Sequence, residues 1–261
     1  MIVGGTVLTE QMAMSNTRDF GDKVVLITGS ARNLGRAIAE ALAQAGAAVV
    51  INSRSSKQEM EATAAAIKAA GGRAIAHLAD ITDADAVKRM VQAAVDTFGK
   101  LDILVNNAVA HHVKPFQELS FDDWRHTMAV ILDGTFHCTQ ACVPEIVRSG
   151  GGSIVNMGGA FGHMPHPGRA ATSAAKAGLA GLTRALALEL AAHNINVNCV
   201  SPGPANTVRE TPSQFDTKRI PLGRFAEPSE VVAMVKLLCS PDGRYITGQT
   251  IHVNGGLYMN N

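Results

Sequence analysis

The chain alternates short apolar runs with amphipathic helical patterns from Lys23 to its end. This alternation is typical of repeated βαβ units, in which parallel strands form a central sheet and the connecting helices cover it. The apolar runs predict strands at residues 24–27, 48–52, 73–77, 103–106, 154–157, 196–200 and 250–253.

The segments between these runs predict helices at residues 35–45, 57–70, 83–98, 121–149, 173–193 and 228–238. Two glycine stop signals support the first pair, because Gly46 follows the first helix and Gly71 the second. The pattern therefore predicts an α/β fold: a single Rossmann-type, doubly wound parallel sheet of seven strands, with helices on both faces.

A chain of 261 residues is long enough for one large α/β domain and short for two. We expect residues 21–261 to form that domain and residues 1–20 to be an N-terminal arm. Met12 and Met14 lie just before the first strand. Residues 1–13 therefore fit either a flexible arm or an over-extended start.

Composition removes several classes of partner. The formal net charge is only +1, which gives no reason to expect a nucleic acid or an anionic membrane as a partner. The N-terminus has no basic region, and no apolar run reaches the roughly 18 residues of a membrane span. We therefore expect a cytoplasmic protein.

Four cysteines lack the spacing of a metal site, and they are Cys138, Cys142, Cys199 and Cys239. We interpret all four as reduced thiols of the core, and we expect no bound metal.

A glycine-containing turn follows the first strand and contains Gly29, Ser30, Arg32, Asn33, Leu34 and Gly35. A strand, a tight turn and a helix start in this order aim backbone N–H groups and a helix N-terminus at a diphosphate. Gly29 lets the chain turn, and Gly35 lets the helix pack close to the strand. The turn therefore predicts a dinucleotide-binding site.

The spacing TGxxxNxG resembles the TGxxxGxG of the short-chain dehydrogenase/reductase superfamily, with Asn33 at the middle glycine. Further motifs match in order along nearly the whole chain. The resemblance implies that nucleotide contacts come from Asp80 and Ile81 beside the adenine, from Asn106, Asn107 and Ala108 in an NNAG-like motif, and from Pro202, Gly203 and Thr207 over the nicotinamide and diphosphate. Motifs near the C-terminus also resemble those of the superfamily, at residues 220–224, 228–231, 245–249 and 254–256.

The end of the second strand indicates which nucleotide is preferred. An acidic residue there binds the ribose hydroxyls of NAD, but this chain has Ser53 followed by Arg54, with Arg32 in the facing turn. Two guanidiniums and no carboxylate favour NADP(H) over NAD(H). The alternative is that both arginines are solvated loop residues.

The resemblance also implies a catalytic set that this chain has largely lost. Family members place a Tyr four residues before a Lys, a Ser about thirteen residues before that Tyr, and an Asn on the preceding long helix. Here Lys176 remains, but Thr172, Gly159 and Ile131 occupy the other positions. A threonine hydroxyl has a pKa far above the value of about 10 for tyrosine and a shorter reach, so the ordinary relay is disfavoured. Lys176 fits a ribose-binding role better than that of a solvated helix lysine.

One branch of the superfamily, the 2,4-dienoyl-CoA reductases, works without the usual pair. Its pattern maps onto Thr172 as a hydroxyl, Asp133 as an acid and Phe161, which lacks the hydroxyl that branch has. An acyl-CoA enzyme therefore stays open.

The predicted site also contains histidines that do not belong to the family's catalytic set. His111 and His112 follow the fourth strand, and His163 and His166 lie in the loop before Thr172, all beyond carboxyl ends of strands. One hypothesis is that His163 or His166 supplies a replacement acid or base near neutral pH. The alternative is that these are solvated loop residues.

Two functions from different classes remain. The first is an NADP(H)-dependent oxidoreductase with a modified or missing proton relay, acting on an unknown carbonyl, alcohol or enoyl-thioester substrate. The second is an inactive homologue that serves as a nucleotide-binding or structural subunit beside an active relative. A lyase or hydratase activity is a weaker third.

The resemblance implies a homotetramer or a dimer whose copies contact one another through helices 121–149 and 173–193. A mixed oligomer with an active relative is the alternative. A short segment between Thr207 and Ile220 takes the place of the family's substrate lid.

Overall fold

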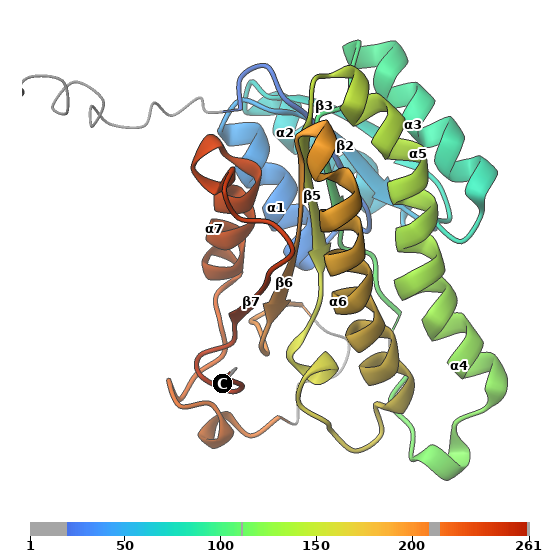
Figure 1. Ribbon diagram of the computed structural model, residues 1–261, viewed down its shortest axis with the longest axis vertical. Coiled ribbons are helices and arrows are strands. Elements are labelled where there is room, and N and C mark those ends of the chain that lie inside the picture. The colour runs from blue at the N-terminus through green and yellow to red at the C-terminus, as the bar shows by residue number, and fades with distance from the viewer. Residues whose placement is uncertain (1–19, 111, 209–214, 260–261) are drawn as a thin grey trace, which may run out of the picture.

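The computed structural model describes residues 20–110, 112–208 and 215–259. At its centre is a parallel sheet of seven strands in the order β3-β2-β1-β4-β5-β6-β7 (Figure 1). The strands are β1 Val24–Ile27, β2 Ala48–Ser53, β3 Arg73–Leu78, β4 Ile103–Asn106, β5 Gly152–Met157, β6 Ile195–Pro202 and β7 Thr250–Val253. The predicted fold class is confirmed.

Helices cover both faces of this sheet (Figure 1). They are α1 Asn33–Gln44, α2 Lys57–Ala69, α3 Ala84–Phe98, α4 Phe121–Met128, α5 Gly134–Arg148, α6 Ala170–Leu190 and α7 Pro228–Cys239. One core cluster joins the sheet to α1, α2 and α7, and a second joins it to α3, α5 and α6. The hydrophobic core thus lies in two layers, one on each side of the strands.

Alternate side chains of β1 enter opposite layers. Val25 and Ile27 belong to the first core cluster, whereas Val24 and Leu26 belong to the second. All four are at most 2% exposed. A strand that is covered on both faces is apolar throughout, which is why the sequence pattern locates it residue by residue.

The domain begins one residue earlier than predicted. Phe20, assigned to the arm from the sequence, is 1% exposed and packs in the first core cluster. The rest of the predicted arm, residues 1–19, lies outside the described residues. All four cysteines are free and buried. Within the described ranges, no helix is both long and apolar enough to pass through a lipid bilayer.

The long helix predicted at residues 121–149 is interrupted. α4 passes into a π-helical stretch, Ala129–Asp133, before α5 begins at Gly134. Such wider turns are rare and rotate the side chains that follow relative to a regular helix. Ile131 lies in this stretch, 1% exposed, and packs with Ala175 and Leu179 of α6.

A ladder of buried polar side chains ties the middle of the sheet to two helices. Asn106 Nδ2 donates to Asn156 Oδ1 at 2.9 Å and lies 3.3 Å from Thr139 Oγ1 on α5. Asn156 Nδ2 in turn donates to Thr183 Oγ1 on α6 at 2.9 Å. Because buried amides are costly when unpaired, this ladder fixes the register of β4 and β5 against both helices.

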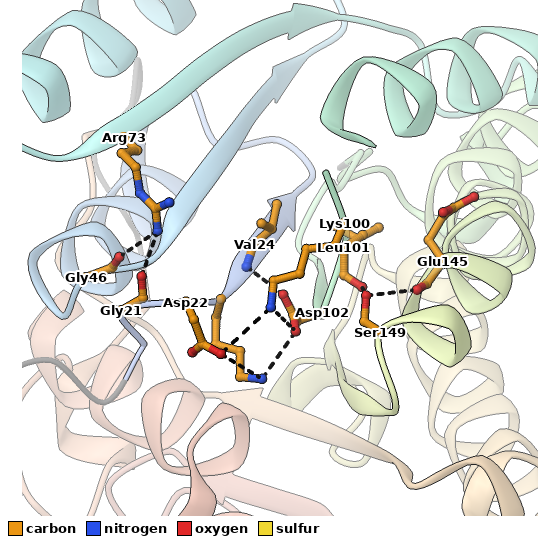
Figure 2. A network of polar contacts seen from close by, with 11 residues as sticks. Gly21, Asp22, Val24, Gly46, Arg73, Lys100, Leu101, Asp102, Glu145 and Ser149 are labelled. Carbon is orange, nitrogen blue, oxygen red and sulfur yellow. Dashed lines mark hydrogen bonds and ion pairs between the residues drawn. The ribbon is translucent and has the colours of Figure 1, made fainter. Parts of the chain in front are cut away.

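A second polar network lies at the amino ends of β1 and β4 (Figure 2). Asp102 is 1% exposed, and its carboxylate accepts from the Val24 backbone N–H at 2.9 Å and from the ammonium groups of Lys23 and Lys100 at 3.2 and 3.1 Å. Asp22 adds longer ion pairs to both lysines. This network stabilises the amino ends of β1 and β4, at the opposite end of the sheet from the carboxyl ends of the strands.

Candidate functional site

The strand order reverses direction at β1, whose neighbours are β2 and β4. In open α/β sheets, ligands bind outside the carboxyl ends of the strands at such a switch point. Gly29 follows β1 with φ +61°, and Asn33 begins α1 with φ +54°. Both values fall in the left-handed region, which Gly and Asn tolerate better than other residues. The predicted tight turn is therefore present at the switch point.

Two features keep the turn compact. A Cβ on Gly35 would lie 2.3 Å from the Gly29 carbonyl oxygen, so only glycine fits there. Asn107 Nδ2 donates to the carbonyl oxygens of Thr28 and Gly29 at 3.0 and 2.9 Å, and the Thr28 hydroxyl accepts from the Ala108 N–H. The segment after β4 thus supports the turn, and this arrangement leaves the start of α1 close to the sheet, as a bound diphosphate requires.

Three of the predicted nucleotide contacts have side chains that pack into the protein. The Ser30 hydroxyl is fully buried, donates to Ile27 O and accepts from Asn52 N, so it joins the turn to β2. Asn106 belongs to the buried ladder described above. Leu34 packs against the first core cluster. These residues shape the site through the backbone rather than by offering side-chain contacts.

Arg32 and Arg54 are both exposed at this edge of the sheet. Ser53, at the end of β2, is 9% exposed and its hydroxyl accepts from the Ser56 N–H, which shapes the loop that carries Arg54. Neither guanidinium forms an ion pair or hydrogen bond within the described ranges. Both are therefore available to an anionic ligand.

Asp80 and Ile81 border the other side of the turn. Asp80 Oδ1 accepts from the backbone and hydroxyl of Thr82 at 2.9 and 2.8 Å. Ile81 is buried, and its carbonyl oxygen lies 3.1 Å from His137 Nδ1 on α5. Sequence reasoning did not identify His137, since nothing in its local pattern distinguishes it from a surface helix residue.

The segment after β6 reaches the turn. Pro202 ends β6, and Gly203 packs against Asn254 so closely that a Cβ would lie 2.9 Å from the Asn254 Cα. Beyond Thr207, the Val208 N–H donates to Asn33 Oδ1 at 3.0 Å across 175 positions of sequence. The structure therefore brings together two predicted walls of the nucleotide site.

Lys176 lies in the interior, 6% exposed, on the face of α6 toward β5. Its ammonium donates to the Met157 carbonyl oxygen at 2.5 Å. Burial lowers the pKa of Lys176 from 10.5 to about 8, against a smaller opposite effect of Cys199. A buried lysine with a pKa near neutrality is suited to holding a ribose hydroxyl or exchanging a proton.

Around Lys176, the groups expected to handle a substrate oxygen are small or apolar. Thr172 lies one turn earlier on α6, 2% exposed, and its hydroxyl has no hydrogen-bond partner in the part of the chain that the structure describes. A Cβ on Gly159 would have no atom within 4 Å. The hydrocarbon side chain of Ile131 can neither donate nor accept a hydrogen bond. Of the four catalytic positions, only Lys176 therefore keeps an ionisable side chain, and Gly159 has room for a further side chain.

Asp133 is not brought to this region. It is exposed, two residues beyond the buried Ile131, so the two side chains leave the helix in nearly opposite directions. Its predicted catalytic role has no geometric support here.

The loop histidines are held by aromatic contacts. His163 meets the ring of His252 on β7 at 4.7 Å and that of Tyr258 at 5.5 Å between centroids. His166 packs edge-on against Phe161 at 5.2 Å. No hydrogen bond or ring contact between described residues joins either histidine to Thr172 or Lys176. Burial, with a smaller contribution from Arg184, lowers the pKa of His163, which favours its neutral form.

The histidines after β4 do not extend the site. His112 Nδ1 lies 3.2 Å from the Thr127 hydroxyl and its Nε2 lies 3.6 Å from Asp123, which ties this loop to α4. His111 lies outside the described residues. No group of three potential metal ligands occurs in residues 20–110, 112–208 and 215–259.

Sequence reasoning missed a wall of aromatic and basic residues beside Thr172. Phe161 meets Phe215 at 6.3 Å, and a guanidinium lies over each ring: that of Arg169 over Phe161 at 4.6 Å and that of Arg219 over Phe215 at 5.2 Å. The predicted lid segment supplies Phe215 and Arg219, although its residues 209–214 lie outside the described ranges. No local signal pairs these two segments, because the contact depends on the fold.

Known proteins are similar to this chain over most of its length. Residues 29–258 match a family model described as enoyl-(acyl carrier protein) reductase. The chain is 39% identical over 242 residues to the 3-oxoacyl-[acyl-carrier-protein] reductase FabG of Staphylococcus aureus, covering 91% of this chain and 98% of the relative. It is 40% identical over 245 residues to the (2S)-[(R)-hydroxy(phenyl)methyl]succinyl-CoA dehydrogenase subunit BbsD of Thauera aromatica, covering 90% and 96%.

Solved structures are similar over the same range. A dehydrogenase/reductase from Sinorhizobium meliloti superposes with a TM-score of 0.88 at 34% identity, covering 93% of this chain and 98% of that one. A Serratia marcescens short-chain dehydrogenase/reductase mutant superposes with a TM-score of 0.87 at 34% identity, covering 92% and 99%. The likeness thus spans the whole domain.

Proposed function

Because this chain belongs to the short-chain dehydrogenase/reductase superfamily, we propose that it is an NADP(H)-dependent oxidoreductase acting on the carbonyl of an acyl thioester through a modified proton relay. The observation that carries this proposal is the turn between β1 and α1, with Gly29 and Asn33 at positive φ and Gly35 packed on the Gly29 carbonyl. Together they hold the start of α1 against the end of β1, the arrangement that binds a dinucleotide diphosphate.

The residues present fit a nucleotide. The turn and the start of α1 would hold the diphosphate, and Lys176 would hold the nicotinamide ribose. Arg32 and Arg54 would pair with a 2′-phosphate, since both are exposed and without ion pairs in the described part of the chain. When bound, NADPH supplies a hydride to a carbonyl carbon. Family relatives named for 3-oxoacyl and acyl-CoA compounds favour a thioester as the carrier of that carbonyl.

A proton must then reach the substrate oxygen without a tyrosine. Thr172 and Lys176 lie one helical turn apart, on the same buried face of α6. We assign the proton to the Lys176 ammonium, with the Thr172 hydroxyl, which has no partner among the described residues, as the neighbouring group that relays it to the substrate oxygen. A pKa of about 8 leaves Lys176 mostly protonated at pH 7 and able to release the proton.

The cofactor assignment is tested by titrating the purified protein with NADPH and NADH and following nucleotide fluorescence. We expect NADPH to bind at least about tenfold more tightly, because charge-assisted pairs with phosphate contribute roughly 1–3 kcal/mol. Arg54→Glu should reverse the preference, whereas Arg89→Glu on α3, with the same change in charge, should not. Equal affinities for the two nucleotides would contradict the NADP(H) preference.

The modified relay is tested by restoring the family's side chains. Gly159 has an extended backbone, φ 161° and ψ 146°, and space for a Cβ, so Gly159→Ser fits the existing chain. We expect Gly159→Ser with Thr172→Tyr to raise NADPH-dependent reduction of acetoacetyl-CoA by about 10²-fold or more, the usual contribution of a positioned acid. Gly181→Ser is the matched control, because a Cβ on Gly181 of α6 would likewise have no atom within 4 Å.

A second function has its own support. The Thauera relative is named as a subunit of a dehydrogenase, and three catalytic positions of this chain hold Ile131, Gly159 and Thr172. These facts favour a nucleotide-binding subunit that works beside an active relative. NADPH binding without turnover by the purified chain, and turnover after mixing with that relative, would select this function over the first.

A further inference from the structure

The aromatic and basic wall beside the site is built from two separate segments. The loop between β5 and α6 supplies Phe161, His166 and Arg169, and the segment before Ile220 supplies Phe215 and Arg219. We call these five residues the Arg–Phe wall. Its three rings contact one another, since His166 lies 5.2 Å from Phe161 and 6.1 Å from Phe215, and Phe161 lies 6.3 Å from Phe215.

One arginine guanidinium lies over each of the two phenyl rings. Arg169 Cζ is 4.6 Å from the Phe161 centroid, and Arg219 Cζ is 5.2 Å from the Phe215 centroid. A guanidinium over a ring is attracted by the ring's negative face, and the contact restricts its position. Its N–H groups lie at its edges, so a guanidinium held in this way still offers a planar fork of donors to an anion.

The charge of Arg219 has no acidic partner among the described residues. Arg219 is exposed and forms no ion pair within residues 20–110, 112–208 and 215–259. Asp216, the acidic residue closest in sequence, is occupied in accepting from the Lys218 backbone N–H at 2.9 Å. Lys218 adds another exposed positive charge beside Arg219. The described part of this segment is therefore positive.

The wall lies next to the reacting position. Phe161 follows Gly159 by two residues, and Arg169 precedes Thr172 by three, so that Arg169 begins the helix on which Thr172 and Lys176 lie. Arg169 is half-buried and its carbonyl accepts from the Ser173 N–H at 2.8 Å, which fixes its backbone at that helix start. A substrate whose carbonyl reaches Thr172 would place its neighbouring atoms against this wall.

We infer that the Arg–Phe wall binds a carboxylate on the acyl part of the substrate, so that the preferred substrate is a 3-oxoacyl thioester whose acyl chain ends in a carboxylate. This inference rests on the proposed function for the thioester and the reduction, but the wall itself selects the charge. Arg219 supplies the donors, Phe215 positions them, and the rings of Phe161 and Phe215 cover the methylene groups between the carbonyl and the carboxylate.

The test compares two thioesters of equal chain length, 3-oxohexanoyl-CoA and 3-oxoadipyl-CoA, by calorimetric titration of the full chain with NADPH present. They share the CoA moiety and its phosphates, and they differ only in a terminal methyl or carboxylate. We expect 3-oxoadipyl-CoA to bind at least about tenfold more tightly, the effect of one charge-assisted pair. Equal affinities would overturn the inference.

Arg219→Gln should reduce that preference to about twofold or less, because Arg219 is exposed and its loss leaves the fold intact. Arg219→Lys should keep part of it, and Arg89→Gln, an exposed arginine of α3, should keep all of it. Free CoA is the third ligand. If it loses as much affinity in Arg219→Gln as 3-oxoadipyl-CoA does, the arginine serves the CoA phosphates and the carboxylate assignment is wrong.

The same samples separate this inference from the proposed function. Absorbance of NADPH reports turnover, whereas the titration reports the charge preference. If neither thioester oxidises NADPH but 3-oxoadipyl-CoA still binds more tightly through Arg219, the oxidoreductase assignment fails and the carboxylate site stands. Turnover of both thioesters at equal kcat/KM, with equal affinities, would leave the oxidoreductase and remove the carboxylate site.

Discussion

Burying the Lys176 ammonium lowers the stability of the folded protein, and the proposed function of Lys176 accounts for this cost. The unfolded chain protonates this amine with a pKa near 10.5, but burial lowers the folded pKa to about 8. Below pH 8 both states carry the proton, and the folded state bears the full penalty of a buried charge. As pH rises from about 8 to 10.5, the unfolded state binds more protons, so this group's unfavourable contribution declines.

We therefore predict that Lys176→Met raises the free energy of unfolding at pH 7 by about 1–2 kcal/mol, since methionine avoids desolvation but loses the bond to Met157. The gain over the unsubstituted protein should shrink toward pH 10.5. Urea denaturation at pH 7 and pH 10 measures both, with Lys68→Met on the exposed end of α2 as control. A destabilised Lys176→Met protein at pH 7 would show that the ammonium has an ionic partner, contrary to this account.

Individual site residues differ in how far their sequence context could place them. Gly29, Asn33 and Gly35 are fixed by local backbone demands, and the turn motif encodes these directly. Asp133 is a different case, because its direction depends on a π-helical stretch that has no sequence signature. Its exposed position could be found only from the three-dimensional structure.

At the scale of elements, the Asp102 network fastens β4 to β1. Replacing the Asp102 carboxylate by an amide removes a charge and supplies too few acceptors for the Val24 N–H and two ammonium groups. We predict that Asp102→Asn lowers the free energy of unfolding by about 1–3 kcal/mol, because a buried donor loses its partner.

Asp22→Asn is the matched control, since Asp22 is largely exposed and its ion pairs are 3.8 and 4.0 Å long. It should change stability by less than about 0.5 kcal/mol. NADPH affinity should be the same in both proteins, because the network lies at the amino ends of β1 and β4, whereas the nucleotide turn follows the carboxyl end of β1. Weaker nucleotide binding by Asp102→Asn would mean that the two edges are coupled.

Several element boundaries agree with the sequence pattern: β1, β4 and β7 have the predicted bounds, and the helix ends at Gln44 and Ala69 lie one residue before the predicted ones. Others differ by two or three residues, as at both ends of α6, which spans Ala170–Leu190 rather than residues 173–193. The largest difference is the segment at residues 121–149, predicted as one regular helix. Its apolar pattern continues through Ala129–Asp133, so periodicity alone could not reveal the wider turn.

At the scale of the whole molecule, apolar side chains remain uncovered on α5 and α6. Leu188 is 83% exposed and Phe136 is 50% exposed, on the two helices for which we propose a contact between copies. We predict that Leu188→Asp shifts the protein to a smaller assembly, since one charge placed in an apolar contact costs several kcal/mol.

Light scattering after size-exclusion chromatography measures this change. Gln58→Asp on α2, an exposed residue away from α5 and α6, should leave the mass unchanged. If the unsubstituted chain is already monomeric, or if Leu188→Asp has the same mass, these helices do not form the contact.

The overall topology could be predicted because it follows from the repeated βαβ pattern, whereas the Arg–Phe wall could not. Phe161 and Phe215 are separated along the chain by α6 and β6, and their contact depends on how these elements pack. The turn between β1 and α1 could be recognised from the sequence because its backbone demands are local, whereas its contacts with Asn107 and Val208 also depend on the fold.

The hydrogen bond from Val208 to Asn33 has a kinetic consequence. Asn33 belongs to the nucleotide turn, and Val208 belongs to the segment that continues toward Phe215 and Arg219. Nucleotide bound at the turn would therefore restrain Val208 through Asn33. We predict compulsory-order kinetics, in which NADPH binds first and NADP⁺ leaves last. NADP⁺ should inhibit competitively against NADPH, and the hydroxyacyl product should not; a random order of addition would show that the two halves of the site fill independently.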